Sequence, residues 1–194
     1  MQLKEKSYPV DSRGKPDLTF YTDSAEYYAR MHEQYVATVQ GQTGPGHEPE
    51  LAFARRAHAS WGLIAKGAAA IPFALTMLRS AEADAREDGA AILAEMGKGE
   101  SVVDAILSSL AAETDIVARD ALVTALGAMR SKRAVPYIAA IIKDESQDSD
   151  SRWNAAESLG RIARRRFHKQ DNPVQAALDW LNKHEKPADR SRGS

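Results

Sequence analysis

The sequence contains no cysteine. This absence excludes disulfide bonds, thiolate metal sites and thiol nucleophiles, so any metal binding or catalysis would have to use other side chains. A chain without cysteine is compatible with a reducing cytosol. We therefore expect a cytoplasmic protein.

Long apolar runs and an excess of charge are missing as well. No stretch approaches the roughly 18 consecutive apolar residues of a membrane helix, and the opening MQLKEKSYPV lacks the apolar core of a signal peptide. We expect no membrane association. The formal net charge is −1, so the molecule as a whole has no positive field that would attract nucleic acid. Nucleic acid is therefore not the expected partner.

The residue patterns of catalytic and metal sites are scarce too. Histidine precedes glutamate at His32, His47 and His184. A zinc protease needs a second histidine four residues later on the same helix face. Those positions hold Val36, Leu51 and Ala188. No G-x-S-x-G elbow or phosphate-binding glycine loop is present. The sequence predicts no catalytic residue, no metal site and no cofactor.

What the chain does contain is a repeat with a period of 32 to 33 residues. Leu159-Gly160 recurs 33 residues earlier as Leu126-Gly127, and SWGLIA at 60–65 resembles SLGRIA at 158–163. An arginine recurs with the same step, preceded each time by an acidic residue four positions earlier; these arginines are Arg86, Arg119 and Arg152. Aligned positions of this kind indicate an array of repeated structural modules.

Each repeat is predicted to form two helices. In the first, Val103, Ile106 and Leu110 fall on one helical face. Pro72 and Pro136 suit the first turn of such a helix, where the missing N–H costs nothing. The acidic residue is expected to cap the second helix, and its arginine at i+4 has the spacing of an ion pair. The recurrent glycine, at Gly62, Gly127 and Gly160, predicts a close approach of a neighbouring helix.

The segments RWNAAESLGRIA (152–163), ARDALVTALGAM (118–129) and AREDGAAILAEM (85–96) resemble HEAT repeats of the short bacterial type found in bilin lyases. The resemblance implies an all-α fold, an α-solenoid of stacked antiparallel helix pairs that form a HEAT-like superhelix. It implies no particular activity, because one repeat type serves many functions.

The resemblance also sets the expected domain organisation. Residues 1–20 are expected to be irregular, and 21–167 to form a HEAT-like domain of about four helix pairs, the first of them degenerate. Residues 168–186 should form a C-terminal capping helix, and 187–194 a disordered tail, native or vector-derived. Asp23 is the expected cap of the first helix. The tyrosines of that helix, Tyr27, Tyr28 and Tyr35, are expected to cover the open end of the stack.

An iron-dependent hydroxylase of deoxyhypusine is also built from short HEAT repeats, and it places His-Glu pairs just after the repeat arginine. The corresponding positions here are Glu87-Asp88, Asp120-Ala121 and Trp153-Asn154. None of them supplies a histidine. The resemblance therefore does not extend to an iron site.

The resemblance further implies that the second helices line a concave side, where exposed residues form rows across the repeats. The predicted partner-binding residues are Arg55, Arg56, Glu87, Asp88, Asp120, Trp153, Asn154, Glu157 and Arg161. A tryptophan on such a face favours binding, although a solvated face, or Trp153 packed beneath the loop DESQDSD, would give the same pattern. The run RIARRRFHK (161–169) fits either a phosphate-binding patch or cations at a helix C-terminus.

We therefore predict a non-enzymatic protein–protein interaction module that binds a partner protein, a monomer or weak homo-oligomer. Its size and acidic centre favour a bacterial inhibitor or immunity protein that neutralises a toxin; an adaptor subunit is the other role considered. The alternative is a nucleic-acid-binding protein or a DNA-repair glycosylase of the HEAT type. Asp120 near Trp153 suits that alternative, whereas Glu87, Asp88 and Glu157 would repel phosphates.

Overall fold

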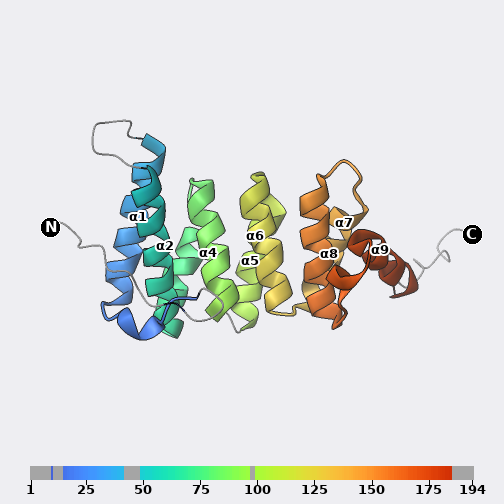
Figure 1. The fold of residues 1–194 in the computed structure, drawn as a ribbon, viewed down its shortest axis with the longest axis horizontal. Helices are drawn as coiled ribbons and strands as arrows, with labels where there is room; N and C mark the ends of the chain where they lie inside the picture. The colour runs from blue at the N-terminus through green and yellow to red at the C-terminus, as the bar shows by residue number, and fades with distance from the viewer. Residues whose placement is uncertain (1–9, 11–14, 42–48, 97–98, 185–194) are drawn as a thin grey trace, which may run out of the picture. The chain divides into compact units, whose positions relative to one another are not determined.

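The computed structural model describes residues 10, 15–41, 49–96 and 99–184 (Figure 1). These residues contain nine α-helices, several short 3₁₀ turns and no β-strand, apart from an isolated bridge between Val10 and Pro16. The predicted all-α, solenoid-type fold class is thereby confirmed. The tail predicted at 187–194 lies outside the described residues, as does most of the segment expected to be irregular.

The chain divides into two compact units, one ending at Gly97 and the other beginning at Lys98. The N-terminal unit contains α1 (Ala25–Gly41), α2 (Pro49–Ala65), α3 (Ile71–Met77) and α4 (Ala83–Met96). Helix α1 packs on α2 and α3 packs on α4, and the second helices α2 and α4 are in contact. Two helix pairs therefore share one core here, as the repeat predicts.

The C-terminal unit contains α5 (Glu100–Ala112), α6 (Ile116–Ala128), α7 (Val135–Lys143), α8 (Ser149–Ala163) and α9 (Pro173–His184). Helices α5 and α6 form one pair and α7 and α8 the next, with α6 packed against α8. Helix α9 contacts both α7 and α8 and buries Ala177 and Leu181. It occupies the place of the expected capping helix, where it covers the apolar side of the last pair.

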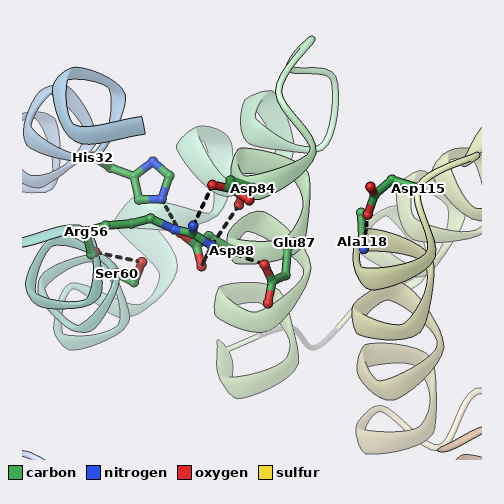
Figure 2. Close-up of polar contacts among 8 residues, drawn as sticks. All are labelled: His32, Arg56, Ser60, Asp84, Glu87, Asp88, Asp115 and Ala118. Atoms are coloured by element: carbon green, nitrogen blue, oxygen red, sulfur yellow. Dashed lines mark hydrogen bonds and ion pairs between the residues drawn. The ribbon is translucent and has the colours of Figure 1, made fainter. Parts of the chain in front are cut away.

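The predicted helix starts in the C-terminal unit are confirmed. The Asp115 carboxylate accepts a hydrogen bond of 3.0 Å from the N–H of Ala118 at the start of α6 (Figure 2). The Asp148 carboxylate does the same for the N–H groups of Asp150 and Ser151 in α8. Each cap satisfies N–H groups that have no partner within the helix.

The start of α1 differs from the expectation. The N–H of Tyr27 donates to Ser24 Oγ at 3.2 Å, so Ser24 caps the helix in place of Asp23. The tyrosines lie as expected at this end of the array: Tyr28 and Tyr35 are buried and Tyr27 is half-buried. No described repeat precedes the first helix pair, and these rings cover its apolar side instead.

The repeat arginine of α8 makes a different contact from the ion pair that its spacing allows. Arg152 Nε donates to the carbonyl oxygen of Ile142 at 3.0 Å, near the end of α7. In α4, Arg86 Nη1 similarly donates to the carbonyl oxygens of Ser80 and Ala81. The last carbonyl groups of a helix have no partner within it, whereas the Asp148 carboxylate is already engaged as a cap. Arg152 therefore ties α8 to the end of α7, and Arg86 ties α4 to the segment that follows α3. At the third repeat arginine, Arg119, Nε and Nη2 are buried without a hydrogen-bond partner among the described residues.

The recurrent glycine marks a close approach at two of its three positions. A Cβ atom at Gly127 would lie 2.8 Å from the Cα of Ser158 in α8, and one at Gly62 would enter the ring of Tyr28 in α1. At Gly160 the expectation of a neighbouring helix is wrong. The obstacle there is the turn that follows α8 itself, with the carbonyl oxygen of Arg165 at 2.8 Å.

The repeat leucine beside this glycine is fully buried, so we expect Leu126→Ala to lower the free energy of unfolding by about 2–5 kcal/mol, through lost burial and a residual cavity. Urea denaturation followed by circular dichroism measures this. Val117→Ala, at an exposed position of the same helix, is the control and should change it by less than about 0.5 kcal/mol. Equal, small effects of the two substitutions would contradict this packing.

Candidate functional site

The predicted binding residues divide between the two units. Arg55, Arg56, Glu87 and Asp88 lie in α2 and α4 of the N-terminal unit. The others lie in α6 and α8 of the C-terminal unit: Asp120, Trp153, Asn154, Glu157 and Arg161. Each unit has its own arrangement of charged and polar groups.

In the N-terminal unit, the guanidinium group of Arg56 is surrounded by carboxylates from α4 (Figure 2). Its Nη1 lies 2.9 Å from Asp84 Oδ2, its Nη2 lies 3.1 Å from Glu87 Oε2, and its Nε donates to Asp88 Oδ2. The three acids occupy positions i, i+3 and i+4 of one helix, so they share one face. One cation therefore binds three carboxylates across the contact between α2 and α4.

His32 in α1 completes this cluster. Its Nε2 lies 2.6 Å from Asp88 Oδ2, and the residue is only 2% exposed (Figure 2). Asp88 thus connects the first helix to the Arg56 group. From the sequence, His32 was considered only as a possible zinc ligand. Its spacing of four residues from the buried Tyr28 was the available signal that its side chain points into the core.

The pKa values of this cluster reflect burial opposed by pairing. Burial raises the pKa of the Glu87 carboxyl, and the charge of Arg56 only partly offsets this. For Asp88, burial also acts to raise the pKa, but the hydrogen bonds from His32 and Arg56 outweigh it and the pKa is lowered. Burial opposes the charge on Arg56, yet its bonds to the carboxylates hold its pKa above the ordinary value. The ionised forms of Arg56 and Asp88 therefore depend on one another.

This geometry differs from the solvent-facing row that the repeat alignment predicts. Arg56 is 8% exposed and its side chain points between helices, where it pairs with acids of the next repeat. Asp88 is likewise turned towards Arg56 and His32, because a buried guanidinium is stabilised only when it is paired. Arg55 does lie on the surface, with its guanidinium 5.5 Å from the ring centroid of Tyr35.

The cluster ties helices together and is poorly suited to hold a ligand. The position among the carboxylates is filled by the protein's own cation, Arg56. Among the described residues, no group of His, Asp and Glu side chains has an arrangement that would hold a metal ion.

We expect Arg56→Met to destabilise the N-terminal unit by about 3 kcal/mol at neutral pH, since it leaves partly buried carboxylates without a cation. Urea denaturation of the variant measures the change. Arg55→Met is the matched control, one residue earlier on the surface of the same helix, and should cost less than about 1 kcal/mol. Comparable losses in the two variants would show that the Arg56 pairs contribute no special stability.

In the C-terminal unit, side-chain hydrogen bonds connect α6 and α8 directly. Ser151 Oγ donates to Asp120 Oδ2 at 2.8 Å. Thr124 Oγ1 donates to Asn154 Oδ1 at 2.9 Å, and Asn154 Nδ2 donates to the main-chain oxygen of Asp120 at 3.0 Å. Together with the close contact between Gly127 and Ser158, these bonds show that the two helices run parallel, with a constant offset. Asp120 and Asn154 therefore fix the register between α6 and α8.

Trp153 lies between Ser151 and Asn154 in sequence but makes no hydrogen bond to α6. Its side chain is 43% exposed in the second turn of α8, and among the described residues it has no ring contact and no hydrogen-bond partner for its indole N–H. Two other exposed apolar residues, Ile116 and Val117, begin the parallel helix α6.

Charged groups lie before and after Trp153 on α8. Asp148 and Asp150 are exposed in the first turn. Glu157 accepts a hydrogen bond of 2.8 Å from Arg161 Nη2, one turn later. With side chains 25% and 45% exposed, this pair lies in solvent and contributes little stability. Helix α8 thus presents an aromatic side chain between acidic groups and an internally compensated ion pair.

Asp120 carries an electrostatic cost. Burial raises the pKa of its carboxyl above the ordinary value, and the hydrogen bond from Ser151 and the charge of Arg119 only partly oppose this. Its Oδ1 is buried and has no hydrogen-bond partner among the described residues. The ionised carboxylate is therefore less favourable in the folded protein than in the unfolded chain.

A group with a raised folded pKa contributes stability that is complete below its unfolded pKa and is lost as the pH rises through the folded value. For Asp120 this loss begins above about pH 4. We therefore expect Asp120→Asn, whose Oδ1 can still accept from Ser151, to gain stability relative to the native chain between about pH 4 and pH 7. Chemical denaturation across this range measures the difference.

Asp171→Asn, at an exposed position after α8, changes the net charge equally and is the control. A variant Asp120→Asn that becomes progressively less stable than the native chain as the pH rises would show the opposite sign and contradict the effect of burial.

Comparison with known proteins gives a family for this architecture. Residues 103–192 match the family model described as HEAT repeats. The matched segment includes the helices that carry Asp120 and Trp153. No curated protein matches the chain significantly. No helix in the described part of the chain is long and apolar enough to cross a membrane.

Proposed function

We propose that the protein is a non-enzymatic module that binds a partner protein through α6 and α8, because residues 103–192 match HEAT repeats, which are generally protein-interaction scaffolds. The observation that carries the proposal is Trp153, exposed on a helix whose position is fixed by polar contacts to its neighbour. The other predicted contact residues of this unit, Asp120, Asn154, Glu157 and Arg161, lie on the same two helices and stay predicted partner contacts.

Trp153 lies in the second turn of a regular helix, where the protein covers part of it and leaves 43% of its surface exposed. Its apolar surface stays in contact with water, and burial of that surface by a partner would stabilise a complex. Tryptophan is among the residues most enriched in interface hot spots, where its truncation costs 2 kcal/mol or more. The indole N–H of Trp153 bonds to no described residue and could donate to a carbonyl group of a partner.

The scaffold under Trp153 supports recognition because it is already ordered. The bonds of Ser151 and Asn154 to α6 flank Trp153 in sequence and hold its helical turn in place. A side chain presented by a fixed backbone loses less entropy on binding than one on a loop. The exposed carboxylates of Asp148 and Asp150 supply a polar rim that favours a cationic or hydrogen-bond-donating partner surface.

The N-terminal unit enters the proposal differently. We assign Arg56, Glu87 and Asp88 chiefly to holding α1, α2 and α4 together, because their side chains pair with each other and with His32. Arg55 is the exposed member of the predicted set in this unit and stays a predicted partner contact.

The proposed role as an inhibitor or immunity protein is distinguishable from that of an adaptor by what binding does to the partner. An inhibitor would capture an enzyme and lower its turnover in proportion to occupancy. An adaptor subunit would leave the catalytic rate of its partner unchanged.

We expect Trp153→Ala to weaken partner binding by about 30-fold or more, corresponding to at least about 2 kcal/mol. Affinity capture from lysate of the native cells, with quantitative mass spectrometry, would identify proteins that the native chain retains and the variant loses. Calorimetric titration of the purified protein found in this way then gives the change in Kd.

Tyr137→Ala is the matched control, because Tyr137 has the same 43% exposure but lies on α7, the first helix of its pair. Its variant should retain the partner. If no captured protein depends on Trp153, or if both variants lose the same proteins equally, the proposed surface is wrong.

A further inference from the structure

A second charged surface lies at the other end of α8. The segment 164–169 contains Arg164, Arg165, Arg166, His168 and Lys169, and all five are exposed. We call these residues the basic end. None of their side chains has a hydrogen bond or ion pair with another described residue. Arg130, which is also exposed, follows α6 at the same end of the unit, because α6 and α8 run parallel.

The basic end is held in a defined conformation. Arg164 ends α8 with positive φ, 56°, and the N–H of Arg165 returns to the carbonyl oxygen of Gly160 at 2.8 Å. Phe167, in the middle of the cations, is buried against α9, where its ring centroid lies 6.5 Å from that of Trp180. The cations on either side of Phe167 are thus anchored to the core by an aromatic side chain.

Helix electrostatics alone do not account for this cluster. Cations are favoured near a helix C-terminus, but the effect falls off within the last turn. Arg161 occupies that turn and already has Glu157 as a partner. The basic end follows the helix, and its like charges repel one another without forming an ion pair with any described acid. A ligand that brings negative charge would remove this repulsion.

We propose that the basic end binds an acidic segment of a protein partner, with carboxylates paired by the guanidinium groups of Arg165 and Arg166. A guanidinium group matches a carboxylate in a bidentate pair. The surface is short, and it is bounded by exposed acids at Asp171 and Asp179 and by Glu157 one turn before Arg161. A continuous nucleic-acid backbone would run onto these carboxylates, and the net charge of −1 offers no attraction at longer range.

This inference rests on the proposed function only in taking the anionic partner to be a protein. It concerns residues outside the Trp153 surface, so the two can fail separately. Trp153→Ala should bind a purely acidic peptide as well as the native chain does, even where it loses the folded partner.

The test is fluorescence anisotropy with a labelled, flexible peptide that carries about six Glu and Asp residues, at low ionic strength where exposed ion pairs are measurable. The same peptide with Gln and Asn in their place is the neutral control. We expect binding of the acidic peptide only, and a loss of about tenfold or more in the double variant R165E/R166E. The double variant R30E/R79E reverses two exposed arginines of the N-terminal unit, changes the net charge equally and should bind like the native chain.

Thermal denaturation checks that the variants fold, and R165Q/R166Q replaces R165E/R166E if the charge reversal prevents folding. The proposal is overturned if the acidic peptide does not bind, if the basic-end variant binds it normally, or if R30E/R79E weakens it equally. It is also overturned if single-stranded RNA, duplex DNA or anionic lipid vesicles bind more tightly than the peptide and compete for Arg165 and Arg166, because the occupant is then a different class of molecule.

Discussion

A pair of short helices cannot bury its own apolar stripe, and this constraint shapes each unit. The side chains of Leu93, Leu126 and Leu159, one in each of three second helices, have zero exposure. Stability in such arrays arises from the contact between neighbouring repeats as much as from the repeats themselves. The polar contacts of this protein act at the same boundaries, where they set the register of surfaces that the apolar groups hold together.

The two units use different polar interactions at the contact between their second helices. In the N-terminal unit the contact between α2 and α4 is charged, with one guanidinium group shared among carboxylates and linked through Asp88 to α1. In the C-terminal unit the contact between α6 and α8 is made by a glycine and by hydrogen bonds from hydroxyl and amide groups, one of which goes to the Asp120 carboxyl group. Paired buried charges are sensitive to the loss of either partner, whereas small neutral groups in close contact are sensitive to added volume.

Much of the fold could be predicted from spacing alone. The repeated leucine, the acidic cap and the proline at the start of a helix act locally, so their periods appear directly in the sequence, and Leu126, Asp148 and Pro136 lie where the pattern predicts. The contacts of long side chains were harder to predict. The reach of Arg152 to a main-chain carbonyl and the inward turn of Arg56 depend on which acceptors the neighbouring helix presents. His32 was missed as a partner of Asp88 because the two are 56 residues apart and belong to different repeats. Trp153 was correctly predicted to be exposed, because it directly follows the repeat arginine Arg152 in α8.

Arg130 and Arg164 end α6 and α8 in the same backbone conformation, with φ of 54° and 56°. Both second helices therefore end in the same kind of turn, closed by the N–H of Ser131 on the carbonyl oxygen of Leu126 and by the N–H of Arg165 on that of Gly160. A segment that runs from Ser131 to Arg164 begins and ends on matching geometry, so a tandem copy inserted after Arg164 would meet a junction that the protein already contains. An array could therefore be lengthened by duplication of the gene segment that encodes residues 131–164, without a new linker sequence.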